Sequence, residues 1–303
     1  MISSFPLHLI VLLLTAILYN PTEAQKSSFA EYRPQPSGMK PTIIFVHGAW
    51  HSPDCFDKVI AFLSERDYYT RKVHLPSVGR SVPVTSTGPD TDAVRRAVLA
   101  ETTKGRDVTV VCHSYGGIPA SQALQGLGKP SSPDRKGRVV SFVYLTAFMP
   151  LEGLSISNLS AQHPDTKSVP LDVTPEGNLV VKKDPSPVPF FYGDLSPEEA
   201  AYWVTRLEPQ AAATFGDPLK YAAWKDIPTF YLFALKDMAI PIDIQRGFVK
   251  DARDLLDKEE GPGTGRRRIS TEEIDSSHSV FLSHPDETAA YIQRAASYGT
   301  KRF

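Results

Sequence analysis

A serine that follows an apolar run in the middle of the chain constrains the fold more than any other feature. Val108–Val111 is apolar apart from Thr109, and it leads into Cys112-His113-Ser114-Tyr115-Gly116-Gly117. A continuous apolar run is typical of a strand covered on both faces of a sheet. We expect a helix over 116–127 directly after it. A serine on a tight strand–turn–helix connection, with small residues beside it, is the setting of an exposed nucleophile.

The rest of the chain alternates between short apolar runs and helical patterns. This alternation predicts an α/β fold with a mostly parallel, doubly wound sheet. The predicted strands are 43–46, 71–75, 108–111, 139–145, 229–234 and 268–274. The predicted helices lie near 52–63, 94–98, 242–256 and after Pro285.

Three segments depart from this pattern. Residues 1–24 have an apolar core that is too short to span a membrane comfortably, and they end in Thr22-Glu23-Ala24. These features predict a signal peptide that is cleaved after Ala24. An uncleaved membrane anchor is the alternative. The polar 25–40 stretch is a predicted linker to a 41–303 domain. Residues 151–222 interrupt the alternation with many Pro, Ser and Asp residues and one expected helix, 198–207. They are predicted to be a lid or cap insertion, with a plain surface loop as the alternative.

Composition excludes several classes of protein. The 33 Lys and Arg balance 34 Asp and Glu, so the chain lacks the positive field that nucleic-acid binding needs. Arg266-Arg267-Arg268 is predicted to be a solvated loop tip. Two cysteines, Cys55 and Cys112, do not make a disulfide framework, although a bridge between them stays open. No paired Cys or His spacing suggests zinc. We expect neither a metal nor an organic cofactor. The Asn158-Leu159-Ser160 sequon fits a secreted glycoprotein.

A serine nucleophile needs a base and an acid, and the order of this fold is serine, acid, histidine. His278 directly follows the last predicted strand, whereas His284 stands beside a helix start and is predicted to lie at the surface. Asp237 follows the 229–234 strand and would orient His278. Asp243 is the alternative acid, but it is expected to open a helix.

Backbone donors for an oxyanion are expected after the first strand and after the nucleophile. The sequence Val46-His47-Gly48-Ala49-Trp50 supplies Ala49, and Tyr115 is the second candidate donor. His47 is predicted to be a buried hydrogen-bonding residue and not the base. Five aromatic residues are candidates to line the pocket, with core packing as the alternative: Trp50, Phe148, Phe190, Phe191 and Trp203.

Several segments together resemble a known family. They are 45–50, 113–117, Leu145-Thr146-Ala147-Phe148-Met149-Pro150, 221–228, 237–241 and Ser277-His278-Ser279. The chain resembles the compact branch of the α/β-hydrolases that includes plant methyl esterases, hydroxynitrile lyases and many bacterial and fungal esterase-like proteins. The resemblance implies the α/β-hydrolase fold, a Ser114–Asp237–His278 triad and an Ala49–Tyr115 oxyanion hole.

The chain also departs from that family pattern. Cys112 replaces the usual first glycine of the turn, the stretch from Asp251 to Arg268 is longer than usual, and the leader is not typical of the plant members. The cyanohydrin-cleaving members carry a lysine after the catalytic histidine, where this chain has Ser279. That difference favours hydrolysis over lyase chemistry.

These observations predict a serine esterase that cleaves a carboxylic ester, lactone or thioester of a small to medium, apolar metabolite. The resemblance to fungal members suggests secondary metabolism, by analogy only. One alternative function is a lyase or cyclase reaction that uses the same residues. The other is a ligand-binding receptor that retains a vestigial site.

Overall fold

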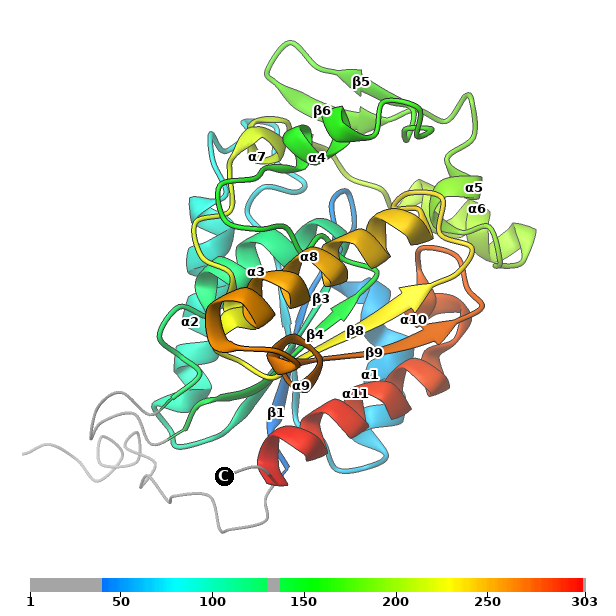
Figure 1. Cartoon of the computed structure of the whole chain (residues 1–303). Coiled ribbons are helices and arrows are strands. Elements are labelled where there is room, and N and C mark those ends of the chain that lie inside the picture. Colours follow the sequence, from blue (N-terminus) through cyan, green and yellow to red (C-terminus); the bar gives the residue numbers. More distant parts are fainter. Residues whose placement is uncertain (1–39, 130–136, 302–303) are drawn as a thin grey trace, which may run out of the picture. The chain divides into compact units, whose positions relative to one another are not determined.

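Six parallel strands form the main sheet of the computed structural model, which describes residues 40–129 and 137–301. The strand order is β2–β1–β3–β4–β8–β9 (Figure 1). The predicted parallel α/β sheet is therefore confirmed, and two strands have the predicted bounds. The strands are β1 Thr42–Val46, β2 Thr70–Val73, β3 Val108–His113, β4 Val139–Leu145, β8 Thr229–Ala234 and β9 Ile269–Ile274.

Helices cover both faces of this sheet (Figure 1). α1 (Asp57–Ser64) and α11 (Pro285–Lys301) pack against each other on one face. The other face carries α2 (Gly88–Thr102), α3 (Gly117–Ala123) and α8 (Ile242–Glu260). Because both faces are covered, the central strands β3 and β4 are buried along their whole length and are mostly apolar. Shorter helices are η2 Pro53–Phe56, η3 Ser114–Gly116, η4 Ala223–Lys225, α9 Thr264–Arg268 and α10 Val280–Ser283.

The strand order reverses between β1 and β3, because the chain runs outward from β1 to β2 and then returns to β3 on the other side of β1. The register pairs Val46 with Cys112 and Cys112 with Tyr144, so these strands end at nearly the same level. In sheets of this kind, a crevice forms outside the carboxyl ends of the strands at the point of reversal. The loops after β1 and β3 therefore meet where a ligand site is expected.

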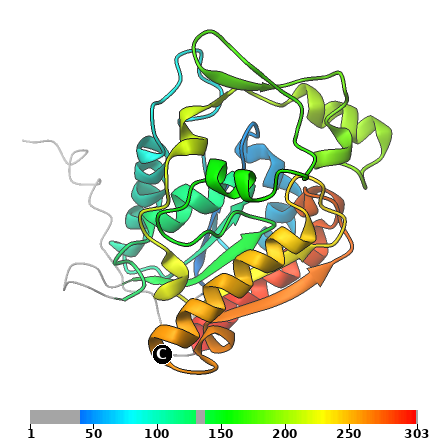
Figure 2. The same cartoon turned by 45° about the horizontal axis from the view of Figure 1, so that its top comes forward.

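The segment 151–222, which we call the cap segment, lies beyond the carboxyl ends of the strands (Figures 1 and 2). The predicted 198–207 helix is α6 (Pro197–Thr205). The sequence did not predict a three-stranded antiparallel sheet, because its strands have only two to four residues and little hydrophobic alternation. The remaining elements are α4 Ile156–Gln162, β5 Leu171–Val173, β6 Asn178–Val181, α5 Val188–Phe191, β7 Gln210–Ala211 and α7 Ala213–Gly216.

The structure decides one open alternative and contradicts one expectation. Cys55 and Cys112 are buried and unpaired, so the possible bridge is absent. Arg266 and Arg267 are exposed but lie in α9, not at a loop tip, because Asp257 accepts a hydrogen bond from Gly265 N at 2.7 Å and holds this turn against α8. The predicted signal peptide and nearly all of the linker lie outside the described residues. Within the described ranges, no helix is long and apolar enough to span a membrane.

The turn after β3 depends on a close approach of two backbones. A Cβ atom on Gly116 would lie 2.5 Å from His47 O and 2.8 Å from Val46 O at the end of β1. A Cβ atom on Gly117 would lie 2.1 Å from Phe148 O, after β4. Main-chain atoms cannot rotate away as a flexible side chain can, so these two positions require glycine.

Gly116→Ala should therefore lower the free energy of unfolding by about 1–3 kcal/mol, since the added methyl group overpacks against fixed backbone. Gly247→Ala is the matched control, because Gly247 lies in α8 with nothing within 4 Å of its added Cβ. The control should be stabilised by up to about 1 kcal/mol through helix propensity. Urea unfolding of both variants measures the difference, and equal stabilities would contradict the close approach.

Buried neutral histidines lie at the ends of the strands. Leu75 N donates to His47 Nε2 at 3.1 Å, so His47 Nδ1 carries the proton and donates to Gly48 O at 2.8 Å. His51 Nδ1 donates to Ala49 O at 2.7 Å, and its Nε2 accepts from the Tyr192 hydroxyl at 2.7 Å. Burial lowers the pKa of His47 to about 3 and that of His51 to about 4. His47 thus has the buried hydrogen-bonding environment that the sequence predicted.

These lowered pKa values predict instability in acid. Below about pH 6.5 the unfolded chain binds protons at His47 and His51 while the folded chain does not, so lowering the pH favours unfolding. Between pH 6.5 and 5 each histidine should cost about 2 kcal/mol of stability. His51→Gln should remove its share of this pH dependence, and His163→Gln, at an exposed site in the cap segment, should not. Unfolding free energies at several pH values measure the slopes; identical slopes in all three proteins would contradict the assignment.

Candidate active site

Ser114 stands at the turn between β3 and α3 with a left-handed backbone, at a φ of 50°. A non-glycine residue in this conformation costs about 1–3 kcal/mol and persists only where the surroundings hold it. Such strain is typical of the serine on a nucleophile elbow, because it keeps the hydroxyl clear of the backbone. Cys112 is tolerated in place of glycine because its side chain points into the core, where Sγ lies 3.4 Å from Val143 O.

The loop after β1 lies directly against this turn. A Cβ atom on Gly48 would lie 2.9 Å from Ser114 Cβ and 2.8 Å from His113 Nδ1. Ala49 follows Gly48, and both Ala49 and Tyr115 line the same cavity as Ser114. The two candidate oxyanion donors therefore belong to the two loops that flank the serine.

Tyr115 is anchored through its side chain. Its hydroxyl donates to Asp90 Oδ2 at 2.6 Å, and Ser77 N donates to Asp90 Oδ1 at 2.8 Å. Burial raises the pKa of Asp90, although the hydrogen bonds from Ser77 and Tyr115 oppose that rise. The Tyr115 ring also stacks on Phe215, so the side chain of the residue that carries the candidate donor N–H is fixed by two contacts.

His278 and Asp237 lie together at the ends of β9 and β8. His278 Nδ1 is 2.7 Å from Asp237 Oδ2, and both side chains are almost fully buried. No hydrogen bond joins Ser114 Oγ to His278 within the described residues, and such contacts are often long before a substrate binds. The alternative acid, Asp243, is exposed in the first turn of α8. His284 is half-buried, with its Nε2 4.0 Å from Asp194 Oδ2.

His113 packs against His278. The two imidazole rings have centroids 4.5 Å apart, and His113 Nε2 donates to His278 O at 3.1 Å. Burial, together with the neighbouring His278, lowers the pKa of His113 well below its ordinary value. His113 is therefore a neutral residue that supports the backbone of His278.

Three polar residues at the site were missed from the sequence. Thr146 Oγ1, after β4, donates to His278 O at 3.1 Å. Gln245 Nε2, on α8, donates to Asp237 Oδ2 at 3.1 Å. Asp194, in the cap segment, accepts bonds from Ser276 Oγ and Ser277 N at 2.8 Å each, beside His278. Only Thr146 had a detectable signal, because it is a polar residue at the end of a predicted strand.

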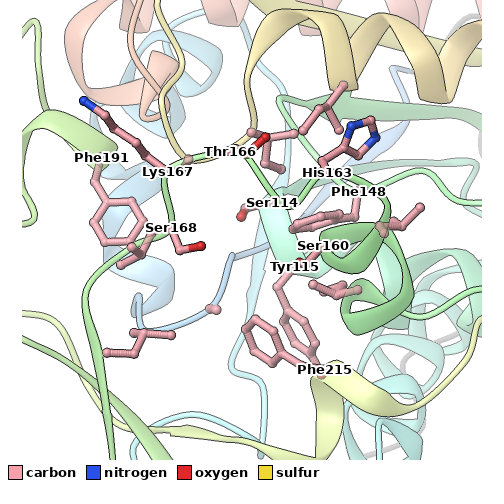
Figure 3. A pocket seen from close by; sticks show the side chains of 18 of the residues that line it. Ser114, Tyr115, Phe148, Ser160, His163, Thr166, Lys167, Ser168, Phe191 and Phe215 are labelled. Carbon is pink, nitrogen blue, oxygen red and sulfur yellow. The ribbon is translucent and has the colours of Figure 1, made fainter.

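A cavity of about 260 Å³ opens above Ser114, between the sheet edge and the cap segment. Figure 3 shows Ser114 between Phe191 on one side and Phe148 and Phe215 on the other. Of the five aromatic candidates, Trp50, Phe148 and Phe191 line the cavity, whereas Phe190 and Trp203 pack against the hydrophobic core. Further apolar lining residues are Ile156, Leu159, Val169, Leu171, Ile240 and Ile244.

Among the described residues, no cluster of three or more His, Cys, Asp or Glu side chains could hold a metal ion. The polar groups nearest Ser114 are instead arranged as donors, acceptors and a buried Asp–His pair. This arrangement suits proton transfer and stabilisation of negative charge.

Comparisons with known proteins find relatives that are named as hydrolases. The chain is 29% identical over 261 residues to an alpha/beta hydrolase of Aspergillus novofumigatus, an alignment that covers 85% of this chain and 97% of that protein. It is 27% identical over 279 residues to the pFDCC methylesterase of Arabidopsis thaliana, covering 86% of this chain and 97% of that one. The crystal structure of a pyrethroid hydrolase, 22% identical, matches with a TM-score of 0.64 over 85% of this chain and 98% of its own.

The model of the alpha/beta hydrolase family matches residues 43–291, which include all six strands of the main sheet except one residue at the start of β1. The predicted fold and the resemblance to esterase-like proteins are both confirmed. The chain belongs to the alpha/beta hydrolase family.

Proposed function

We propose that this chain is a serine hydrolase that cleaves carboxylic esters through an acyl-enzyme on Ser114. The proposal is carried by the buried Asp237–His278 pair, together with a strained serine that lines an apolar cavity. Membership of the family and the methylesterase name of one relative support ester hydrolysis. Lactones and thioesters contain the same acyl carbon and belong to the proposed substrate class.

The proposed reaction has two steps. In the first, His278 Nε2 takes the proton from Ser114 Oγ as this oxygen attacks the ester carbonyl, and the N–H groups of Ala49 and Tyr115 hold the oxyanion. His278 then gives the proton to the departing alcohol. In the second step, His278 removes a proton from water, hydroxide attacks the acyl-enzyme, and the acid leaves as Ser114 recovers its proton. Asp237 keeps His278 oriented and stabilises its cationic form.

Variants of the two candidate acids test the triad. Asp237→Asn should lower kcat for a p-nitrophenyl ester by about four orders of magnitude, because the imidazole loses its orienting acceptor, and Ser114→Ala should reduce turnover to background. Asp243→Asn is the matched control, since Asp243 is exposed in α8 and should retain the parent activity. A large loss in Asp243→Asn together with an active Asp237→Asn would reverse the assignment.

The charge of the cavity wall suggests which esters fit. Among the described residues that line the cavity there is no carboxylate, and the basic side chains are Lys167 and His163. Lys167 is exposed and makes no ion pair among the residues that the structure describes. Figure 3 shows Thr166, Lys167 and Ser168 on the part of the cap segment that passes beside Ser114. We therefore propose that apolar esters with a neutral or anionic distal end are preferred over cationic ones.

Lys167→Glu should change this preference. A reversed charge at the cavity should lower kcat/KM for the p-nitrophenyl monoester of adipic acid about five- to tenfold relative to p-nitrophenyl hexanoate, because one charge pair near water contributes about 1 kcal/mol. Lys183→Glu, also exposed in the cap segment but outside the cavity lining, is the control. An unchanged ratio for Lys167→Glu at low salt would remove Lys167 from the substrate site.

A further inference from the structure

Gln245 is a fully buried polar residue in the first turns of α8, and its amide faces the candidate acid. Its Nε2 donates to Asp237 Oδ2 at 3.1 Å and to Ile240 O at 2.6 Å. Its Oε1 accepts from Ala234 N, at the end of β8, at 3.2 Å. One side chain therefore joins the end of a strand, the loop after it and the carboxylate of Asp237.

These partners fix the orientation of the amide. Ala234 N is a donor, so it must face the amide oxygen of Gln245, while Ile240 O and Asp237 Oδ2 are acceptors and must face the NH₂ group. An amide turned by 180° would place oxygen against two acceptors and NH₂ against a donor. Gln245 is thus held as a hydrogen-bond donor to Asp237.

The Asp237 carboxylate is fully engaged as an acceptor. Oδ1 accepts from Ala239 N at 2.8 Å and from Ile240 N at 2.9 Å. Oδ2 accepts from Gln245 Nε2 and from His278 Nδ1, the latter at 2.7 Å. Two donors on each oxygen leave the plane of the carboxylate no freedom to rotate about χ2. Gln245 therefore acts together with the loop to hold Oδ2 opposite His278.

We propose that Gln245 is a positioning residue that locks Asp237 Oδ2 against His278 Nδ1, and so keeps the lone pair of His278 Nε2 available to Ser114. This inference rests on the proposed function, because it acts through the same three residues. Because Gln245 holds Asp237 Oδ2 as a hydrogen-bond acceptor, the imidazole nitrogen that faces it must be a donor. The proton therefore lies on His278 Nδ1, and Nε2 keeps its lone pair.

A purely structural link between α8 and β8 would affect stability alone, so the test needs a matched loss of hydrogen bonds. Gln122 provides it. This buried residue on α3 donates from Nε2 to Thr87 and Thr91 at 3.1 Å each, and its Oε1 accepts from Lys220 N at 2.9 Å. None of these partners is Asp237 or His278. Gln122→Leu and Gln245→Leu therefore each remove a buried amide that bridges three groups.

The expected result is a split between stability and catalysis. Both Leu variants should lower Tm, but only Gln245→Leu should lower kcat for p-nitrophenyl hexanoate about 10- to 100-fold, with KM nearly unchanged. A loss of this size is expected when a general base is no longer well positioned.

Gln245→Glu keeps the shape of the side chain and serves if the Leu variant does not fold. Its added carboxyl beside the Asp–His pair should move the midpoint of the acidic limb of the kcat/KM profile to higher pH, because negative charge stabilises imidazolium. Gln122→Glu should leave the midpoint unchanged.

Proton NMR gives a readout that does not depend on turnover. The low-field resonance of the His278 Nδ1–H, assigned by its absence in His278→Ala, should be lost or shifted in Gln245→Leu and retained in Gln122→Leu. The inference is overturned if Gln245→Leu keeps both this resonance and the parent kcat, or if Gln245→Glu leaves the pH profile unchanged. A parent protein that shows the resonance but hydrolyses no ester would instead contradict the proposed function.

Discussion

The close approach of the β1 and β3 loops is the constraint on which the site depends. Ser114 can hold a left-handed backbone only because the loop at Gly48 and the glycine at 116 let two backbones touch. The strain at Ser114 is balanced by the six-stranded sheet, whose central strands are fully buried. The packing that stabilises the fold at this turn therefore also holds the Ser114 hydroxyl in position.

The remaining residues of the site are placed by the ends of other strands. Asp237 follows β8, His278 follows β9 and Thr146 follows β4, so parallel strands bring together residues far apart in sequence. The cap segment contributes the outer wall of the cavity and also touches the loop that carries His278, through Asp194. A movement of the cap segment would therefore reach the candidate base as well as the substrate space.

The sequence predicted the parts of the molecule that depend on local pattern. Val139–Leu145 and Thr229–Ala234 were found with correct bounds because buried parallel strands are predominantly apolar runs. The cap hairpin was missed because strands of three or four residues carry little periodicity. Gln245 was missed for a different reason: a glutamine in an amphipathic helix has no local signature, and only the three-dimensional structure shows that it faces Asp237.

The central claim is that Ser114 is an activated nucleophile, and labelling with a fluorophosphonate probe tests it most directly. Purified protein should react at one site, mass spectrometry of its peptides should place the adduct on Ser114, and Ser114→Ala should not react. Asp237→Asn should react much more slowly. A folded parent protein that does not react, or an adduct on another serine, would contradict the account.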